Sequence, residues 1–181
     1  MGSQPARLGK REGETSLTYF ATDDAGNAEA PHTLTIKVDK TPPSLTVPQS
    51  PTVQYSDALT FNVGAQDNLT PTDALRFSAT GLPSGLTFTD NLNGTATVSG
   101  KALVQAATYP VAISVTDLAG LVTTKPVSII VSKEDAQLAY TGDTLLKAGS
   151  PVTLSATVTE PPDGSPGDIT KRPSSSTSPL A

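Results

Sequence analysis

The amino-acid sequence predicts an all-β protein in which two-sheet sandwich modules follow one another along the chain. The 181 residues include 16 Pro and 14 Gly among many Thr, Ser and Val, which is typical of short strands separated by frequent turns. Apolar and polar residues alternate over short segments, whereas sustained helical periodicity is hard to find. The sequence also resembles itself at a spacing near 93 residues, about the length of one sandwich module.

The internal repeat rests on three pairs of segments that align at offsets of 93 or 94 residues: LTYFATDDAG (17–26) with VAISVTDLAG (111–120), LTIKV (34–38) with VSIIV (127–131), and LTF (59–61) with VTL (152–154). In this alignment Asp23 corresponds to Asp117, and Asp67 corresponds to Glu160. Each pair couples a strand pattern to a turn, so we interpret the repeat as structural.

The repeat predicts five segments: a disordered start (1–13), the C-terminal strands of a truncated module (14–41), a complete module (42–132), the N-terminal part of a further module (133–170) and a disordered tail (171–181). Pro42 and Pro43 make the first junction a short, stiff hinge, because proline fixes φ and has no N–H. Lys133 to Asp135 form the second junction. The tail is either a natural Ser/Pro linker or the result of truncation or a reading-frame change within a module.

The strand pattern can be followed in order. In the first segment Leu17, Tyr19 and Ala21 alternate on one strand, and 34–38 forms its partner. In the complete module we expect seven strands: 44–47, 58–65, 75–80, 86–89, 95–99, 108–117 and 125–132. Asn93-Gly94 is a strong hairpin signal. Seven short strands with turns between them predict immunoglobulin-like (Ig-like) Greek-key sandwiches in tandem, one complete and two partial.

Several motifs of the complete module resemble a known family: GLPSGLT (81–87), NGTATVSG (93–100), YPV (109–111) and VTDLAG (115–120). In this order they are similar to the putative-Ig, cadherin-like repeat of bacterial surface proteins. The usual Gly-Thr-Pro is replaced by Gly100-Lys101-Ala102, which we expect to change a turn and leave the core intact. The flanking segments resemble related bacterial Ig-like tandem repeats. The resemblance implies a spacer, an adhesive stalk or an accessory module of a carbohydrate-active enzyme, with neighbouring Ig-like modules as partners.

The composition excludes several classes of ligand and of site. The net charge is −5 and the pI is about 4.7, so a nucleic-acid backbone would be repelled. Cysteine is absent, which excludes disulfides and thiolate metal sites. No segment reaches the ~20 apolar residues of a membrane span, and the start lacks the apolar region of a signal peptide. We expect a monomer that is extracellular or at the cell surface, with its export signal and anchor outside this sequence.

Acidic residues are the one class that suggests a ligand. Four residues are predicted to meet at one pole of the complete module: Asp67, Asn68, Asp73 and Asp117. Either Asp39 or Asp135 could join them from a linker. Calcium takes six to eight hard oxygens from carboxylates, amides and carbonyls, so this clustering suggests a calcium site. The alternative is that Asp and Asn simply cap turns through their own backbone.

Catalytic chemistry finds little support. His32 is the only histidine and is expected in an exposed loop, without the partners that a catalytic triad or a zinc site needs. Five aromatic residues are candidates for a sugar-binding face, although most suit a core better: Tyr55, Phe77, Phe88, Tyr109 and Tyr140. We therefore expect a non-catalytic extracellular structural or adhesive spacer, with a surface glycan or a protein as a conceivable ligand. The alternative is an accessory carbohydrate-binding module.

Overall fold

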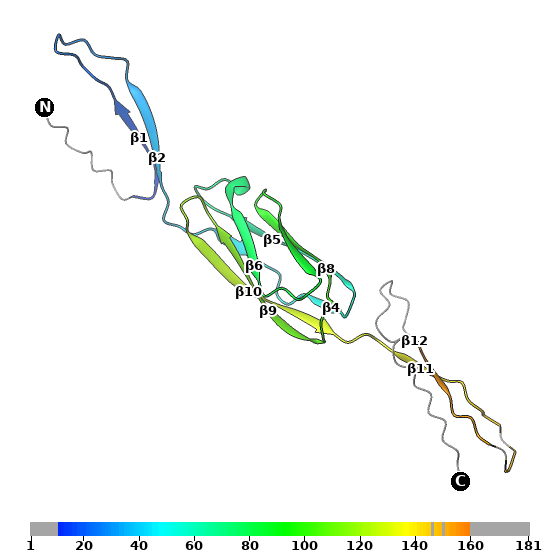
Figure 1. Cartoon of the computed structure of the whole chain (residues 1–181). Coiled ribbons are helices and arrows are strands. Elements are labelled where there is room, and N and C mark those ends of the chain that lie inside the picture. Colours follow the sequence, from blue (N-terminus) through cyan, green and yellow to red (C-terminus); the bar gives the residue numbers. More distant parts are fainter. Residues whose placement is uncertain (1–10, 146, 150, 160–181) are drawn as a thin grey trace.

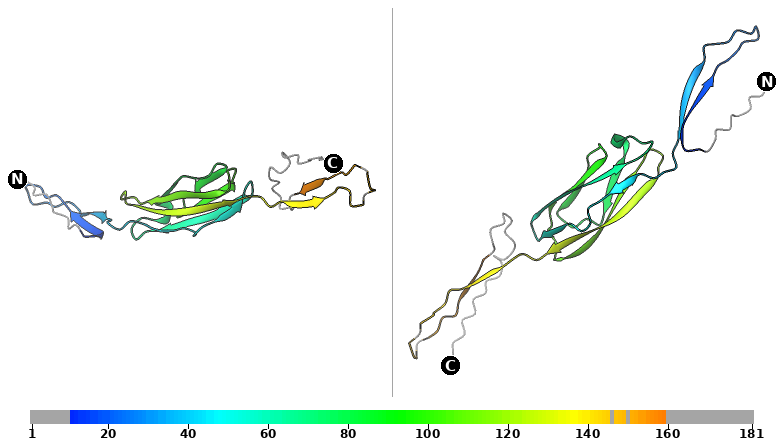
Figure 2. Two further views of the ribbon diagram at one scale, coloured as in Figure 1. Left: turned by 90° about the horizontal axis from the view of Figure 1, so that it is seen from below. Right: turned by 180° about the vertical axis from the view of Figure 1, so that it is seen from behind.

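The computed structural model describes residues 11–145, 147–149 and 151–159, which form β-strands and one short 3-10 helix, η1 (Thr72–Ala74). A sandwich lies in the middle of the molecule, and a two-stranded ribbon extends from each of its ends (Figures 1 and 2). Within this described part, no helix is long and apolar enough to cross a membrane. The predicted all-β fold class is confirmed.

The sandwich consists of two four-stranded sheets. One has the order β3 (Ser44–Thr46), β5 (Ala58–Gln66), β8 (Thr95–Lys101), β7 (Leu86–Asp90), and the other has the order β4 (Thr52–Gln54), β10 (Val122–Ser132), β9 (Ala107–Thr116), β6 (Arg76–Thr80). β4 pairs with β10 in parallel, whereas the remaining pairs within these sheets are antiparallel. The chain stays within one sheet from β7 to β8 and from β9 to β10 and crosses to the other sheet at each of the remaining connections, as in an Ig-like Greek key.

The seven predicted strands are all present, with ends that differ by up to three residues. β10 begins at Val122, three residues before the prediction, because it pairs with β9 as far as Thr116. The prediction missed β4. This strand has only three residues and is held by its parallel partner β10, which lies far away in the sequence, so alternation within the segment could not reveal it.

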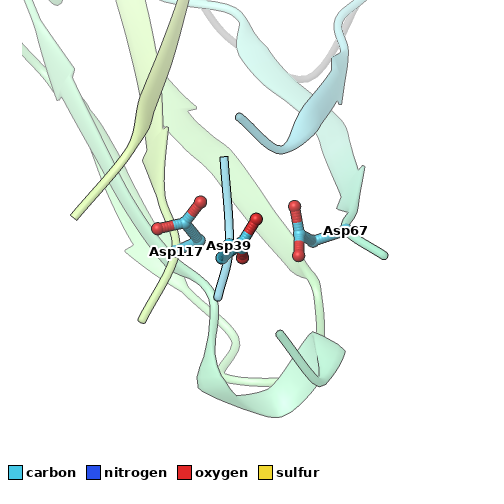
Figure 3. A group of neighbouring side chains, drawn as sticks. All are labelled: Asp39, Asp67 and Asp117. Carbon is cyan, nitrogen blue, oxygen red and sulfur yellow. The ribbon is translucent and has the colours of Figure 1, made fainter. Parts of the chain in front are cut away.

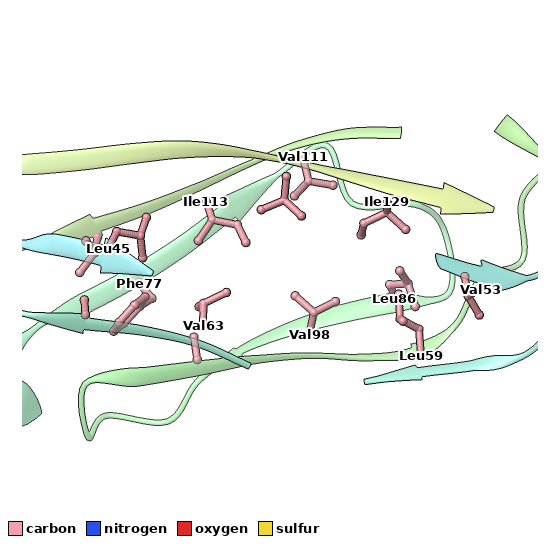
Figure 4. Close-up of a cluster of buried hydrophobic side chains, with 14 of the residues drawn as sticks. Leu45, Val53, Leu59, Val63, Phe77, Leu86, Val98, Val111, Ile113 and Ile129 are labelled. Carbon is pink, nitrogen blue, oxygen red and sulfur yellow. The ribbon is translucent and has the colours of Figure 1, made fainter. Parts of the chain in front are cut away.

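Alternating aliphatic residues of the two sheets meet in one core (Figure 4). Val111, Ile113 and Val115 of β9 are essentially inaccessible to solvent, as is Val98 of β8 in the opposite sheet. Ala102 is also completely buried, so the replacement in the Gly100-Lys101-Ala102 segment reaches the core, and the expectation that it changes only a turn was wrong.

The two flanking ribbons repeat pairings found in the sandwich. β1 (Gly13–Tyr19) pairs with β2 (His32–Val38), and β11 (Gln137–Tyr140) pairs with β12 (Ala156–Thr159). Both antiparallel registers match those of the sandwich: the pairs β1–β2 and β9–β10 correspond at offsets of 94 and 93 residues, and β11–β12 corresponds to β3–β5 at 93. The predicted tail (171–181) lies outside the described residues, as does most of the predicted start (1–13).

Candidate metal centre at the first junction

Three aspartates from separate segments come together where the first ribbon meets the sandwich. Asp39 follows β2, Asp67 follows β5, and Asp117 follows β9. One carboxylate oxygen of each lies within 4.8 Å of one from each of the others (Figure 3). β5 and β9 lie in opposite sheets and both end at the pole that receives the linker, so residues 50 positions apart become neighbours.

Asp117 is the most deeply buried of the three, with 6% of its surface exposed. Its Oδ1 accepts a hydrogen bond of 2.8 Å from the backbone N–H of Leu121, which closes the turn between β9 and β10. Its Oδ2 is buried and accepts no hydrogen bond. A buried carboxylate oxygen without a hydrogen-bond donor is costly, because no protein group replaces its lost hydration.

The two carboxylate oxygens of Asp67 also differ in their hydrogen bonding. Its Oδ2 accepts hydrogen bonds from the backbone N–H groups of Leu69 (2.9 Å) and Thr70 (2.8 Å), which shape the loop after β5. Its Oδ1 is buried and accepts no hydrogen bond. The hydroxyl of Thr70 accepts a hydrogen bond of 3.2 Å from the N–H of Leu118, so the two loops that carry the aspartates are tied together.

The turn of the first ribbon provides an internal comparison, because Asp23 there corresponds to Asp117 at an offset of 94 residues. Asp23 Oδ1 accepts from the N–H of Asn27 at 2.8 Å, as Asp117 Oδ1 does from Leu121. The Nδ2 of Asn27 also donates to Asp23 Oδ2 at 2.9 Å, which is the main reason that the pKa of Asp23 lies below its ordinary value. Leu121 occupies the place of Asn27 and offers no such donor. The turn therefore needs one carboxylate oxygen, and at Asp117 the other is left over.

Two of the four residues predicted for the site do not join the group of carboxylates and form other contacts. Asn68 Nδ2 donates a hydrogen bond of 2.6 Å to Glu12 Oε1, which also accepts one of 2.6 Å from the hydroxyl of Thr41. Asp73 lies in η1, where its backbone carbonyl accepts from the guanidinium of Arg76, and its carboxylate is not part of the group of three.

Glu12 was missed by the sequence analysis, since nothing in its surroundings marks it. Its hydrogen bonds with Thr41 and then with Asn68 lower its pKa below the ordinary value. Asp39 was considered beside Asp135 as a contributor from a linker, and among the described residues the group of carboxylates contains Asp39. The first junction thus has a hydrogen-bonded clasp through Glu12 beside the three aspartates.

The donor set suits a hard divalent cation. Three carboxylates bring up to three negative charges into a space under 5 Å across, and two of their oxygens are buried without hydrogen bonds. Calcium prefers such oxygens and tolerates irregular geometry, whereas magnesium demands an octahedral shell and gives up water reluctantly. A neighbouring cleft of about 150 Å³ is lined by residues of the ribbon and linker, such as Asp39, and by residues of the sandwich, such as Thr70. It offers space for waters to complete the coordination.

Other features show little that would support catalysis or sugar stacking. His32 is exposed and begins β2, so its expected place in a loop was wrong; its ring stacks on Tyr19 with centroids 5.5 Å apart. Phe77 is buried in the core, and only Tyr140 of the five candidate aromatics is more than half exposed. An open groove of about 720 Å³ beside β3 and β5 is lined by residues such as Asn62, and none of the lining side chains is ionisable.

The chain is similar to several solved structures at low sequence identity and at TM-scores below 0.5. The sialic acid-binding region of the Streptococcus sanguinis SK1 adhesin is 15% identical with a TM-score of 0.46, over 67% of this chain and 47% of that one. The SrpA adhesin of Streptococcus sanguinis is 18% identical with a TM-score of 0.44, over 67% and 92%. The protocadherin gamma-B4 extracellular domain is 15% identical with a TM-score of 0.45, over 82% and 27%. The chain thus spans about half the length of the first of these structures.

No curated protein is detectably similar to the sequence. The profile of the family described as "Putative Ig domain" matches residues 42–132, which are the residues of the sandwich. This match covers half of the sequence and agrees with the motifs noted between residues 81 and 120. The chain therefore belongs to this Ig-domain family.

Proposed function

We propose that the chain is a non-catalytic structural module of an extracellular protein, in which Ca²⁺ bound by Asp39, Asp67 and Asp117 fixes the first junction. The observation that carries the proposal is the buried carboxylate of Asp117, whose Oδ2 accepts no hydrogen bond and which lies beside the carboxylates of Asp67 and of Asp39 in the linker. A spacer must transmit force and orientation from one module to the next, and this requires a stiff junction. A cation shared between linker and sandwich supplies that stiffness.

The electrostatics explain why the cation would act as a switch for the junction. In its absence the three carboxylates repel one another. Asp67 and Asp117 are anchored in turns of the sandwich, whereas Asp39 accepts its hydrogen bond, of 3.1 Å, from the N–H of Thr41 within the linker and can therefore move away together with the linker. A bound cation reverses the sign of the interaction and draws Asp39 toward the sandwich. Millimolar extracellular calcium matches the weak affinities, about 10⁻⁴–10⁻³ M, of extracellular calcium modules.

Support for the non-catalytic part of the proposal comes from the residue inventory. The sequence contains one histidine and no cysteine, and His32 is exposed, with the carboxylate of the likewise exposed Glu29 3.9 Å from its Nε2. The extracellular location rests on the resemblance to bacterial surface repeats. The alternative of an accessory carbohydrate-binding module finds no matching observation, because the candidate aromatic residues do not form an exposed platform.

The test is a thermal melt of the full chain in excess chelator, in millimolar Ca²⁺, and in Mg²⁺ at the same ionic strength. Binding to the folded state adds RT ln(1 + [L]/Kd), about 1.4 kcal/mol for 1 mM calcium at a Kd of ~0.1 mM. For a sandwich of this size that corresponds to a rise in Tm of several degrees. Magnesium should give a clearly smaller shift.

Asp117→Asn and Asp23→Asn form a matched pair for this test. Both keep an oxygen for the turn hydrogen bond, but only Asp117 belongs to the group of three aspartates. We expect Asp117→Asn to abolish the calcium shift and to leave the stability in chelator unchanged or higher, because one repelling charge is removed. Asp23→Asn should retain the full calcium shift. Equal calcium shifts in both variants and the unmodified chain would mean that the aspartates only cap turns.

A further inference from the structure

We infer that the inner face of the β1–β2 ribbon is an interaction surface for a four-stranded antiparallel sheet of the same kind as β3-β5-β8-β7. This ribbon face contains the aliphatic and aromatic side chains that alternate on one side of the two strands: Leu17, Tyr19, Leu34, Ile36 and Val38. Tyr19 and Leu34 are 52% and 50% exposed, which is high for two large apolar side chains on adjacent strands. The inference does not depend on calcium.

The complete module shows what covers such a face. Leu17 pairs with Leu34 across the ribbon as Val111 pairs with Val127 across β9 and β10. Val111 and Val127 are 1% and 3% exposed, because the sheet β3-β5-β8-β7 lies over them. The correspondence holds along the strands, since the pair Glu14–Lys37 likewise matches Thr108–Ile130.

The side chains on the two faces also have matching chemistry. Ile36 and Val38 of β2 correspond to Ile129 and Val131 of β10, which are 0% and 2% exposed. On the opposite side of β1 and β2 the residues are polar, and Glu14 forms an ion pair with Lys37. A ribbon with one polar and one apolar face corresponds to the two central strands of one sheet of the sandwich, and a ribbon alone is only marginally stable in water. The partner that fits is therefore a sheet with an aliphatic inner face.

The experiment supplies this partner within the chain. A copy of residues 42–105, which contains β3 to β8, is fused directly before Glu12 in place of residues 1–11; this junction preserves the offset of 94 residues. The chain has no cysteine, so Leu34→Cys introduces a single reporter on the ribbon face. We expect its thiol to react with a labelling reagent at least about 100-fold more slowly in the fusion than in the otherwise unmodified chain, because labelling then requires unfolding.

Two controls separate coverage of the face from other effects. The same fusion with Val98→Asp in the copied segment puts a charge into the inner face of the added sheet, and the thiol should regain its rapid labelling. A chain in which the whole of 42–132 is duplicated shows whether an added module folds at this position. If the duplicated module folds but the ribbon in the fusion stays reactive, the inference is overturned.

The unmodified chain provides a further outcome. If its Leu34→Cys thiol is already protected, and the protection increases with protein concentration, a second copy of the chain covers the ribbon and the proposed partner is wrong. Rapid labelling that does not depend on concentration, together with protection in a monomeric fusion that is lost with Val98→Asp, supports the four-stranded sheet as the partner.

Discussion

Replacing Gly100 with alanine tests how closely β7 and β8 are fitted together. Gly100 has a φ of +135°, and a Cβ added there would lie 2.2 Å from the carbonyl oxygen of Gly85. That oxygen accepts a hydrogen bond of 3.1 Å from the N–H of Lys101, so it cannot move away without breaking the bond. Because the contact is with backbone, no side-chain rotation relieves it.

Gly120 offers the matched control. Its φ is +83°, but an added Cβ would meet nothing within 4 Å. Alanine at Gly120 therefore suffers only the conformational cost of a positive φ, about 1–2 kcal/mol. Alanine at Gly100 adds a steric cost of about 1–3 kcal/mol, as for other overpacked positions, and we expect a total of about 2–5 kcal/mol.

The measurement is the thermal and urea unfolding of the sandwich in the full chain. A domain of this size loses about 4–8 °C in Tm for each kcal/mol, so the two variants should be clearly separated. The reasoning would be refuted if Gly100→Ala and Gly120→Ala lowered the free energy of unfolding by the same amount to within about 0.5 kcal/mol, because the steric cost alone should exceed that difference.

Four further predictions address the core, the junction and the independence of the module. Ile129→Ala should destabilise the sandwich by about 2–5 kcal/mol in urea unfolding, because the side chain is completely buried. Leu121→Asn should reduce the calcium shift of the thermal melt, because it offers Asp117 the donor that the equivalent turn already has; an unchanged shift would contradict the comparison between the two turns. Glu12 has a lowered pKa, so its clasp should stabilise the junction above the ordinary carboxylate pKa and lose that contribution as the pH falls through the lowered value. An NMR titration checks this, and a Glu12 that titrates at its ordinary pKa would be inconsistent with the clasp. Residues 42–132 alone should unfold in one cooperative transition as a monomer, whereas a broad, gradual melt followed by circular dichroism would count against their independence.

Most of the strands could be predicted because the pattern that identifies each strand lies within its own short segment of the sequence. In β9 and β10 a side chain points inward at every second position, so the alternating residues around Val111 and Ile129 disclose both strands. The hairpin that Asn93-Gly94 predicted is present between β7 and β8, but the residues with positive φ in its turn are Leu92 and Gly94 and not the Asn-Gly pair. β4 escaped prediction because its three residues become a strand only through a partner about 78 positions away.

The candidate site could likewise be predicted only in part from the sequence. Sequence alone placed Asp67 and Asp117 at the ends of strands that reach one pole, because strand direction follows from the order of strands and turns. Only the tertiary structure decided that Asp39 joins them, that Asn68 turns to Glu12 and that Asp73 stays apart. These outcomes depend on the paths of loops and of the linker in three dimensions, which non-local pairing between the sheets determines. The folded chain also determines which carboxylate oxygens accept hydrogen bonds from backbone N–H groups and which remain buried without a partner. Sequence cannot give this distinction, since burial exists only once the sheets have packed.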